Sequence, residues 1–468
     1  MESANVRIQR IAFSDFKNIG YGSVDFASLK YNGQSKGDIL GLYGQNGSGK
    51  TSLVEVLAIL KEVLSGRSLG DEYNNYIAID KWSSHMDFRF EVKSEEKKFT
   101  VEYSFDLIKK EAENESNVEN PDSLTKYHVS VENELLRMSG IVSDKKIKMQ
   151  TLINSSSKDL PFIPNTKYEE IIGDDIELKN RLMLNKQLAN EKSQSFIFSK
   201  DTMNAIRKNC NVAEYKFVLN ALVNYGNFYL YVVDTKSTGL INLNVGLPFF
   251  FRLYEDKSLS TGSIVIKLEG QSIVAKRIYD TIHLAILNMN TVLEQLIPGL
   301  NVELQNLGPT LLPDKSEGCI VELLSIRNGK SLPLKYESEG IKKIISILQL
   351  LIVMYNNEGI TVAIDELDSG VFEYLLGELL KIISESGKGQ LIFTSHNLRP
   401  LETIDKKFIY FTTTNPENRY IQIKNLQTNN NMRYCYYRDI ILGGQKEELY
   451  NSTNNYEIAL SFKEAGVK

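Results

Sequence analysis

One glycine-rich segment near the N-terminus constrains the fold of this chain more than any other feature. Residues 44–51 read Gly-Gln-Asn-Gly-Ser-Gly-Lys-Thr. An apolar run at 39–43 precedes them and predicts a buried strand, and apolar residues at helical spacing over 52–65 predict a helix. A strand, a glycine loop and a helix in this order form the context that a phosphate-binding P-loop requires.

Each part of this segment has a physical role toward phosphate. Glycines let the backbone form a concave nest of N–H groups, and the following helix adds its positive N-terminal end. Lys50 is expected to neutralise the β- and γ-phosphates, and Thr51 to offer its hydroxyl to Mg²⁺. The residues predicted to contact the nucleotide are Asn46, Gly47, Ser48, Gly49, Lys50, Thr51 and Ser52.

A short acidic motif stands more than 300 residues further along the chain. A β-branched run at 359–364 predicts a strand, and it ends in Asp365 and Glu366. This is the form of a Walker B strand, because a carboxylate at a strand end can hold Mg²⁺ against the nucleotide. Asp365 fits that role, and Glu366 is then placed to orient or deprotonate the attacking water.

Three further short motifs lie around the acidic pair. Ser338 and Gly340 stand at the start of a predicted helix, where a hydroxyl and bare N–H groups can face a γ-phosphate. Leu-Asp-Ser-Gly at 367–370 follows the two acids directly. A predicted strand at 390–394 leads to His396, which is then placed to sense or polarise the γ-phosphate.

The order of these motifs resembles the SMC and RecF branch of ABC-type ATPases, which includes the overcoming-lysogenization-defect nucleases. The resemblance implies ATP and Mg²⁺ as cofactors. It assigns Lys50 and Thr51 to Walker A, and Asp365 and Glu366 to Walker B. It also assigns Ser338 and Gly340 to the signature, Asp368 to the D-loop and His396 to the switch histidine.

Two details qualify this resemblance. Phe16-Lys17-Asn18 is similar to the opening segment of the group, whose basic residue often lies by the nucleotide, so Lys17 is a candidate contact. The signature departs from Leu-Ser-Gly-Gly-Gln, because three of its five positions are occupied by Glu337, Glu339 and Ile341.

The expected fold class is α/β, a P-loop NTPase of ABC/SMC-head type with a mixed sheet core. Period-two alternation at 88–105, followed by strand pairs at 127–153, predicts an antiparallel β lobe. A segment rich in helix-forming residues follows and predicts a mainly helical insertion. The predicted units are the N-terminal half of the head, the insertion and the C-terminal half of the head, at 1–165, 166–298 and 299–468.

A closer resemblance concerns the C-terminal third of the chain. Four motifs look like the AriA ATPases of the PARIS anti-phage defence system, and they stand at 365–374, 394–400, 415–420 and 442–445. In the wider family the signature serves the P-loop of another subunit, which implies a homo-oligomer, at least a dimer. The closer resemblance implies a sensor and scaffold that holds a separate Toprim nuclease until a phage-encoded trigger protein is sensed.

Composition sets limits on other functions. A net charge of -5 and a pI near 5.7 give no support for coating nucleic acid through bulk charge. Three widely spaced cysteines form no metal or disulfide framework, and no apolar run approaches the roughly 20 residues that cross a bilayer. The expected location is the cytoplasm, with no membrane contact.

Two rival functions remain open at this stage. A RecF-like clamp on DNA is one, because lysines could form a local basic face at Lys97, Lys98, Lys145, Lys146 and Lys148. A nuclease is the other, but a Toprim site needs an Asp-x-Asp to hold Mg²⁺. The only aspartates after His396 are Asp405 and Asp439, and they form no Asp-x-Asp. This chain is therefore expected to hydrolyse ATP without cutting nucleic acid itself.

Overall fold

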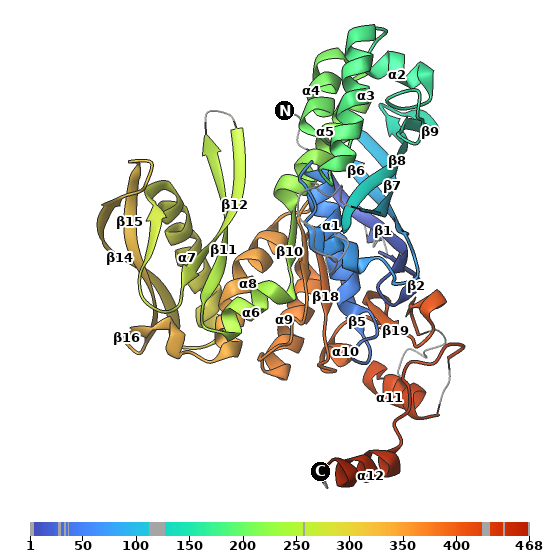
Figure 1. The fold of residues 1–468 in the computed structure, drawn as a ribbon. Helices are drawn as coiled ribbons and strands as arrows, with labels where there is room; N and C mark the ends of the chain where they lie inside the picture. The colour runs from blue at the N-terminus through green and yellow to red at the C-terminus, as the bar shows by residue number, and fades with distance from the viewer. Residues whose placement is uncertain are drawn as a thin grey trace, which may run out of the picture.

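A computed structural model describes residues 4–26, 30–31, 34–35, 37–111, 127–255, 258–423, 431–442 and 445–466. Two glycines of the motif at 442–445, Gly443 and Gly444, lie outside the described residues. The described chain forms a central sheet, an antiparallel lobe topped by helices, and a second lobe on the opposite side (Figure 1).

The central sheet carries both predicted nucleotide-binding strands. Its first five strands are parallel, and the last is antiparallel. Side by side they run β10 (Leu230–Val233), β17 (Thr361–Ile364), β18 (Gln390–Thr394), β5 (Asp38–Tyr43), β19 (Ile409–Thr412) and β20 (Tyr420–Ile421). Because parallel strands end at the same edge, residues that follow β5, β17 and β18 meet there despite their distance in sequence.

Helices cover both faces of this sheet. On β5, Leu40 and Leu42 pack toward α1 (Lys50–Leu64), while Ile39 and Tyr43 pack on the other side. That other side is covered by α8 (Glu339–Asn356), α9 (Glu373–Ser386), α10 (Pro400–Thr403) and α11 (Met432–Leu442). Burial on two faces explains why β5 and β17 are apolar without alternation.

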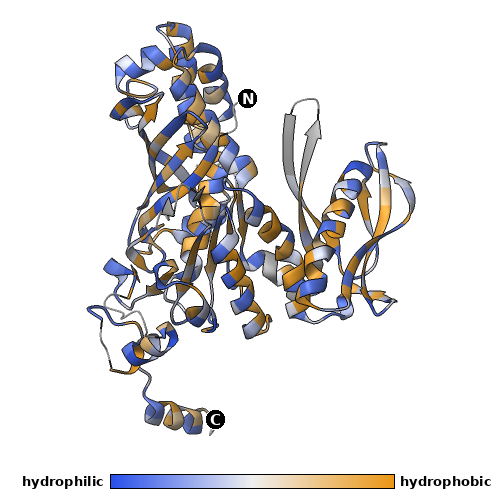
Figure 2. Ribbon diagram, turned by 180° about the vertical axis from the view of Figure 1, so that it is seen from behind, coloured by the Kyte–Doolittle hydropathy of each residue, from blue (hydrophilic) through white to orange (hydrophobic). Residues whose placement is uncertain are grey.

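The strands of the antiparallel lobe extend further than the sequence alone indicates. It contains the predicted strand pairs, and Figure 2 shows apolar and polar residues alternating along its strands. Its order is β2 (Ile19–Asp25), β1 (Asn5–Phe16), β6 (Ser83–Lys93), β7 (Lys97–Glu111), β8 (Tyr127–Val142) and β9 (Lys145–Asn154). Between β2 and β5 lies a small hairpin of β3 (Lys30–Tyr31) and β4 (Gln34–Ser35).

A helical unit packs on this lobe. It contains α2 (Asn165–Ile171), α3 (Ile176–Glu191), α4 (Lys200–Asn209) and α5 (Ala213–Asn224). The buried carboxylate of Glu134 on β8 joins the two, since it accepts hydrogen bonds from Tyr103, Ser195 and the backbone of Phe196. The chain then enters the central sheet through β10.

The second lobe begins after β10 and contains more strand than helix. It comprises α6 (Thr235–Asn242), β11 (Gly246–Glu255), β12 (Ser258–Lys267), β13 (Ser272–Ala275), α7 (Lys276–Leu296), β14 (Leu300–Leu311), β15 (Glu317–Arg327) and β16 (Lys330–Pro333). The predicted boundary at residue 298 falls between α7 and β14, which pack together in this lobe. Ile286 and Met289 of α7 share one apolar cluster with Val302 and Leu304 of β14.

The insertion predicted at 166–298 is therefore two units separated by a strand of the central sheet. Helix α8 links the second lobe to that sheet. Its Ile345 and Leu348 belong to the apolar cluster of the second lobe, while Leu351 and Met354 belong to that of the central sheet.

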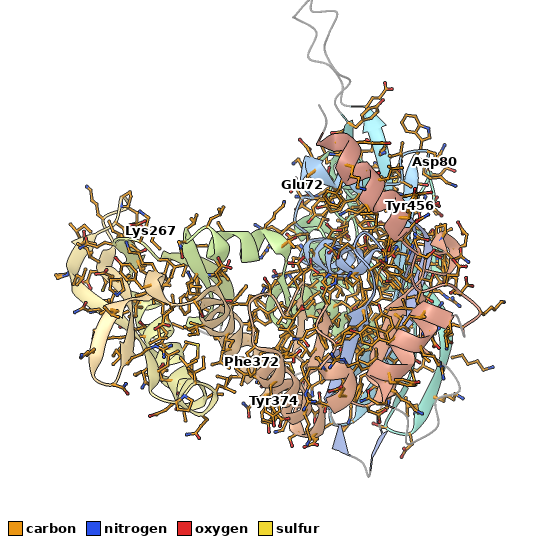
Figure 3. All side chains as sticks on the ribbon, turned by 90° about the horizontal axis from the view of Figure 1, so that it is seen from below. Glu72, Asp80, Lys267, Phe372, Tyr374 and Tyr456 are labelled. Atoms are coloured by element: carbon orange, nitrogen blue, oxygen red, sulfur yellow. The ribbon has the colours of Figure 1, made fainter. Side chains whose placement is uncertain are left out.

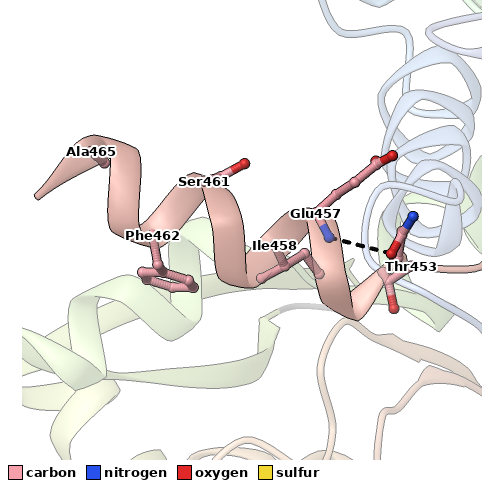
Figure 4. A pocket seen from close by; sticks show the side chains of 7 residues that line it. Thr453, Glu457, Ile458, Ser461, Phe462 and Ala465 are labelled. Carbon is pink, nitrogen blue, oxygen red and sulfur yellow. Dashed lines mark hydrogen bonds between the residues drawn. The ribbon is translucent and has the colours of Figure 1, made fainter.

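The last helix, α12 (Asn455–Ala465), stands apart from the rest of the described chain (Figure 1). All eleven of its residues are exposed. Ile458 and Phe462 point to one side of the helix, and Glu457 and Ser461 to the other (Figure 4). Within the described ranges, none of the helices has the length and apolarity to cross a bilayer.

Candidate nucleotide site

The loop between β5 and α1 has the backbone that a P-loop needs. Gly49 has a φ of +90°, a conformation that side chains with a Cβ rarely adopt. Gly44 lies so close to its surroundings that an added Cβ would stand 1.6 Å from Oγ1 of Thr412. The glycines at these two positions are therefore required by the conformation and by the packing of the loop.

Lys50 occupies the centre of this loop. Its Nζ donates hydrogen bonds to the carbonyl oxygens of Gly44, at 2.9 Å, and Gln45, at 2.8 Å. Burial lowers the pKa of Lys50, and the carboxylates of Asp365, Asp368 and Glu366 act in the opposite direction. The positive charge predicted to meet phosphate therefore faces the acids that follow β17.

Asp365 and Thr51 come together although 314 positions separate them in the sequence. The Oγ1 atom of Thr51 lies 3.4 Å from Oδ1 of Asp365, and Oγ1 of Thr394 donates to the same oxygen at 2.6 Å. The side chain of Asp365 is fully buried, and its Oδ2 has no hydrogen-bond partner among the described residues. A buried carboxylate oxygen without a donor is costly, so this site fits a bound cation.

The residues that surround this oxygen favour Mg²⁺. Oxygen ligands suit this ion, and it is usually held by one or two carboxylates together with water and nucleotide phosphates. No group of three or more histidine, cysteine or acidic side chains among the described residues could hold a metal by itself. Thr51 and Asp365 would hold the ion, and the nucleotide would complete its ligands.

Glu366 has a left-handed backbone, with a φ of +48°. For a residue other than glycine this conformation costs about 1–2 kcal/mol, so the surrounding structure must hold it in place. The backbone N–H of Glu366 donates to Oγ1 of Thr394 at 2.8 Å. Thr394 thus fixes both residues of the acidic pair, and the side chain of Glu366 is half-buried.

Asp368, the predicted D-loop aspartate, is hydrogen-bonded to the backbone of His396, the predicted switch histidine. Oδ2 of Asp368 accepts the backbone N–H groups of His396, at 3.0 Å, and Asn397, at 2.9 Å. Burial and then the charge of Lys50 lower the pKa of His396. The lowered pKa favours the neutral imidazole, which carries one donor and one acceptor nitrogen.

The signature residues lie against the D-loop of their own chain. Ser338 is the N-cap of α8, and its Oγ accepts the backbone N–H of Ile341 at 3.3 Å. An added Cβ on Gly340 would stand 1.9 Å from the carbonyl oxygen of Gly370. The positive end of α8 is thus fixed beside residues 367–370.

The side chain of Lys17 contacts helix α1 in this structure. Its Nζ lies 2.6 Å from Oε1 of Glu55 and 4.0 Å from the ring centroid of Tyr76. Its neighbour Asn18 instead reaches the loop, and its Nδ2 donates to the carbonyl oxygen of Gly47 at 2.6 Å. The opening segment therefore supports the predicted site through Asn18.

A C-terminal segment without a predicted role in the site encloses the P-loop. Thr412 and Ser48 share a hydroxyl hydrogen bond of 2.6 Å, and Tyr420 donates to the carbonyl oxygen of Gly49 at 2.7 Å. Further on, the backbone N–H of Asn451 donates to the side chain of Gln45 at 3.0 Å. No local pattern identifies such contacts, although Tyr420 belongs to the motif at 415–420.

Three solved structures show similarity over most of this chain. An Smc head bound to the C-winged helix domain of ScpA is 12% identical, with a TM-score of 0.39, over 89% of this chain and 97% of that chain. The SMC head domain from Thermotoga maritima is 12% identical, with a TM-score of 0.36, over 90% and 100%. RecF with ATP is 13% identical, with a TM-score of 0.33, over 84% and 94%. No curated protein matches.

The fold and the site together define a P-loop ATPase. The chain belongs to the family described as "AAA domain, putative AbiEii toxin, Type IV TA system", which matches residues 39–402. This match spans the P-loop, the acidic pair and His396 in one continuous range.

Proposed function

We propose that this chain is an ATP-hydrolysing sensor and scaffold in an anti-phage defence complex, where it controls a separate Toprim nuclease. The observation that carries the ATPase part is the cluster around the orphaned Oδ2 of Asp365. Lys50 and Thr51, at the start of α1, and Thr394, at the end of β18, converge on this carboxylate, and Glu366 stands beside it in a held, strained conformation.

The residues of this chain would have the following roles in ATP binding and hydrolysis. ATP with Mg²⁺ supplies the phosphoanhydride bond that is broken. Lys50 and the N–H groups of the P-loop bind and orient the phosphates, and Thr51 and Asp365 hold the cation. Glu366 accepts a proton from the attacking water. The neutral imidazole of His396 hydrogen-bonds near the phosphate end of the site.

A second copy of the chain would complete this site. Ser338 and Gly340 place the start of α8 at the surface beside the D-loop, where it could face the nucleotide of another copy. Phe372 and Tyr374 follow the D-loop directly and are 70% and 54% exposed (Figure 3). Exposed aromatic residues are enriched where proteins meet, which supports a subunit contact on this face.

The defence role rests on the family and on the resemblance of the C-terminal motifs. The family description names a putative AbiEii toxin and a type IV toxin–antitoxin system. The four motifs resemble AriA ATPases, for which a separate Toprim nuclease and a phage-encoded trigger are implied. On this resemblance we assign nucleic-acid cleavage to that separate nuclease.

Two variants test the ATPase and its assembly. Glu366→Gln keeps the shape of the side chain but removes the base, so turnover should fall at least about 100-fold while ATP binding persists. Lys50→Ala should lose binding itself. With ATP, Glu366→Gln should accumulate as a dimer or larger assembly by mass photometry, and Lys50→Ala should not. Wild-type turnover in Glu366→Gln would show that another group is the base.

A clamp that closes on DNA is the second candidate. One structural observation supports this candidate. Val142 pairs with Lys97 on one side and with Lys145 on the other, so these two lysines lie at the same end of the sheet. A DNA clamp should show ATP turnover that duplex DNA stimulates and salt strongly suppresses. A scaffold should co-purify with a nuclease encoded beside it and show no response to DNA.

A further inference from the structure

Two adjacent lysines on α8, Lys342 and Lys343, are both almost completely buried. Each is only 2% exposed, which is uncommon for a lysine unless its charge is compensated. The Nζ of Lys342 donates to the side chain of Asn244 and to the carbonyl oxygen of Lys335, both in the second lobe. Lys343 is the next residue, about 100° further around the helix, and it interacts electrostatically with the acidic residues that follow β17.

The ammonium of Lys343 lies within the negative field of the predicted catalytic residues. Burial lowers the pKa of Lys343 to about 8, and the carboxylates of Asp365, Glu366, Asp368 and Asp234 each act to raise it. Asp365 is fully buried, and one oxygen of Asp368 is buried without a hydrogen-bond partner among the described residues. The charge of Lys343 therefore compensates the negative charge of this acidic cluster.

A second contact ties the same helix to the same loop. Gly340 lies against the backbone of Gly370, so closely that neither residue leaves room for a Cβ on the other. Gly340 and Lys343 are three positions apart, so both lie on one face of α8. One helix face therefore holds the D-loop by its backbone and the acidic cluster by its charge.

We propose that Lys343 is a positioning residue for ATP hydrolysis, an internal counter-charge that holds the carboxylates of Asp365, Glu366 and Asp368 in place and ties them to the signature helix. This inference rests on the proposed ATPase function. The ammonium and Mg²⁺ are two cations that act on the same carboxylates. Removal of the ammonium therefore leaves a more negative site that attracts Mg²⁺ more strongly but holds Glu366 less firmly.

Lys343→Met tests this with little change in volume, and Lys342→Met is the matched control. In Lys343→Met, we expect maximal turnover to fall about tenfold or more, and the Mg²⁺ concentration for half-maximal turnover to fall about three- to tenfold. In Lys342→Met both quantities should stay within about twofold of wild type, because the ammonium of Lys342 bonds to Asn244 and to the carbonyl oxygen of Lys335. A fold-wide defect would instead lower turnover in both variants without changing the Mg²⁺ dependence.

A binding measurement separates this inference from the ATPase proposal. In the Glu366→Gln background, the affinity for a fluorescent ATP analogue is measured with Mg²⁺ and with EDTA, with and without Lys343→Met. We expect Lys343→Met to increase the gain in affinity that Mg²⁺ provides about threefold or more. An unchanged gain would overturn the role of Lys343. Absence of any analogue binding in wild type would overturn the proposed function instead.

A less drastic change keeps the test valid if Lys343→Met does not fold. Lys343→Arg retains the charge and should keep the Mg²⁺ dependence of wild type, even if the larger side chain lowers turnover. A shift of the Mg²⁺ dependence in Lys343→Arg, in the direction expected for the loss of charge, would contradict the proposal.

Discussion

The hydroxyl of Thr394, at the end of β18, donates to Oδ1 of Asp365, at the end of β17, over 2.6 Å. The same hydroxyl oxygen accepts the backbone N–H of Glu366 at 2.8 Å. One threonine thus sets the direction of the carboxylate that would hold Mg²⁺ and the backbone of the residue that would act as base.

Thr394→Val should impair hydrolysis although it preserves the shape of the side chain. A hydrogen bond to a charged group contributes about 1.5–3 kcal/mol, so turnover should fall about 10- to 100-fold. Steady-state ATP hydrolysis measures this. Thr403→Val is the control, because the hydroxyl of Thr403 bonds only to a backbone carbonyl in α10, and turnover there should remain normal.

Glu366→Asn should stabilise the fold while it abolishes turnover. Asparagine tolerates the left-handed backbone that Glu366 adopts at a φ of +48°, so the free energy of unfolding should rise by about 0.5–1 kcal/mol. Urea unfolding measures the change. Glu366→Gln keeps the strain and should show no such gain, and equal stability of the two variants would show that the backbone is not strained.

Two substitutions at Ser338 should separate helix capping from assembly. Ser338→Ala removes the hydroxyl that accepts the N–H of Ile341 and should lower the free energy of unfolding by about 1 kcal/mol. Ser338→Asp retains a good N-cap, so its stability should match wild type. Its negative charge would oppose the nucleotide of another copy, so ATP-dependent association should be lost in mass photometry. Normal association in Ser338→Asp would remove the signature from the subunit contact.

Removal of α12 should leave the stability of the fold unchanged. None of its eleven residues is buried, so a chain that stops after Asn454 should change the free energy of unfolding by less than about 0.5 kcal/mol. A chain that also lacks α11 is the contrast, because Met432, Cys435 and Tyr436 are buried there. Thermal unfolding of both chains measures the difference, and a destabilised first chain would mean that α12 packs against the fold.

The sequence was sufficient to identify the P-loop, the acidic pair and the order of the motifs between Gly44 and His396. These features are local, because a glycine at a positive φ, a strand that ends in carboxylates and an N-cap serine each leave a pattern within a few residues. The class of fold could be predicted from them, since parallel strands bring their carboxyl ends to one edge.

Tertiary structure alone decided which residues support that site. Thr394 holds Asp365, Asn18 rather than Lys17 touches the P-loop, and Tyr420 encloses it from the far end of the chain. Lys342 and Lys343 are neighbours of the same residue type, yet Lys342 donates to Asn244, whereas Lys343 interacts electrostatically with Asp365, Glu366 and Asp368. Such contacts depend on how distant elements pack and on where each side chain is buried, and neither leaves a periodic or local trace in the sequence.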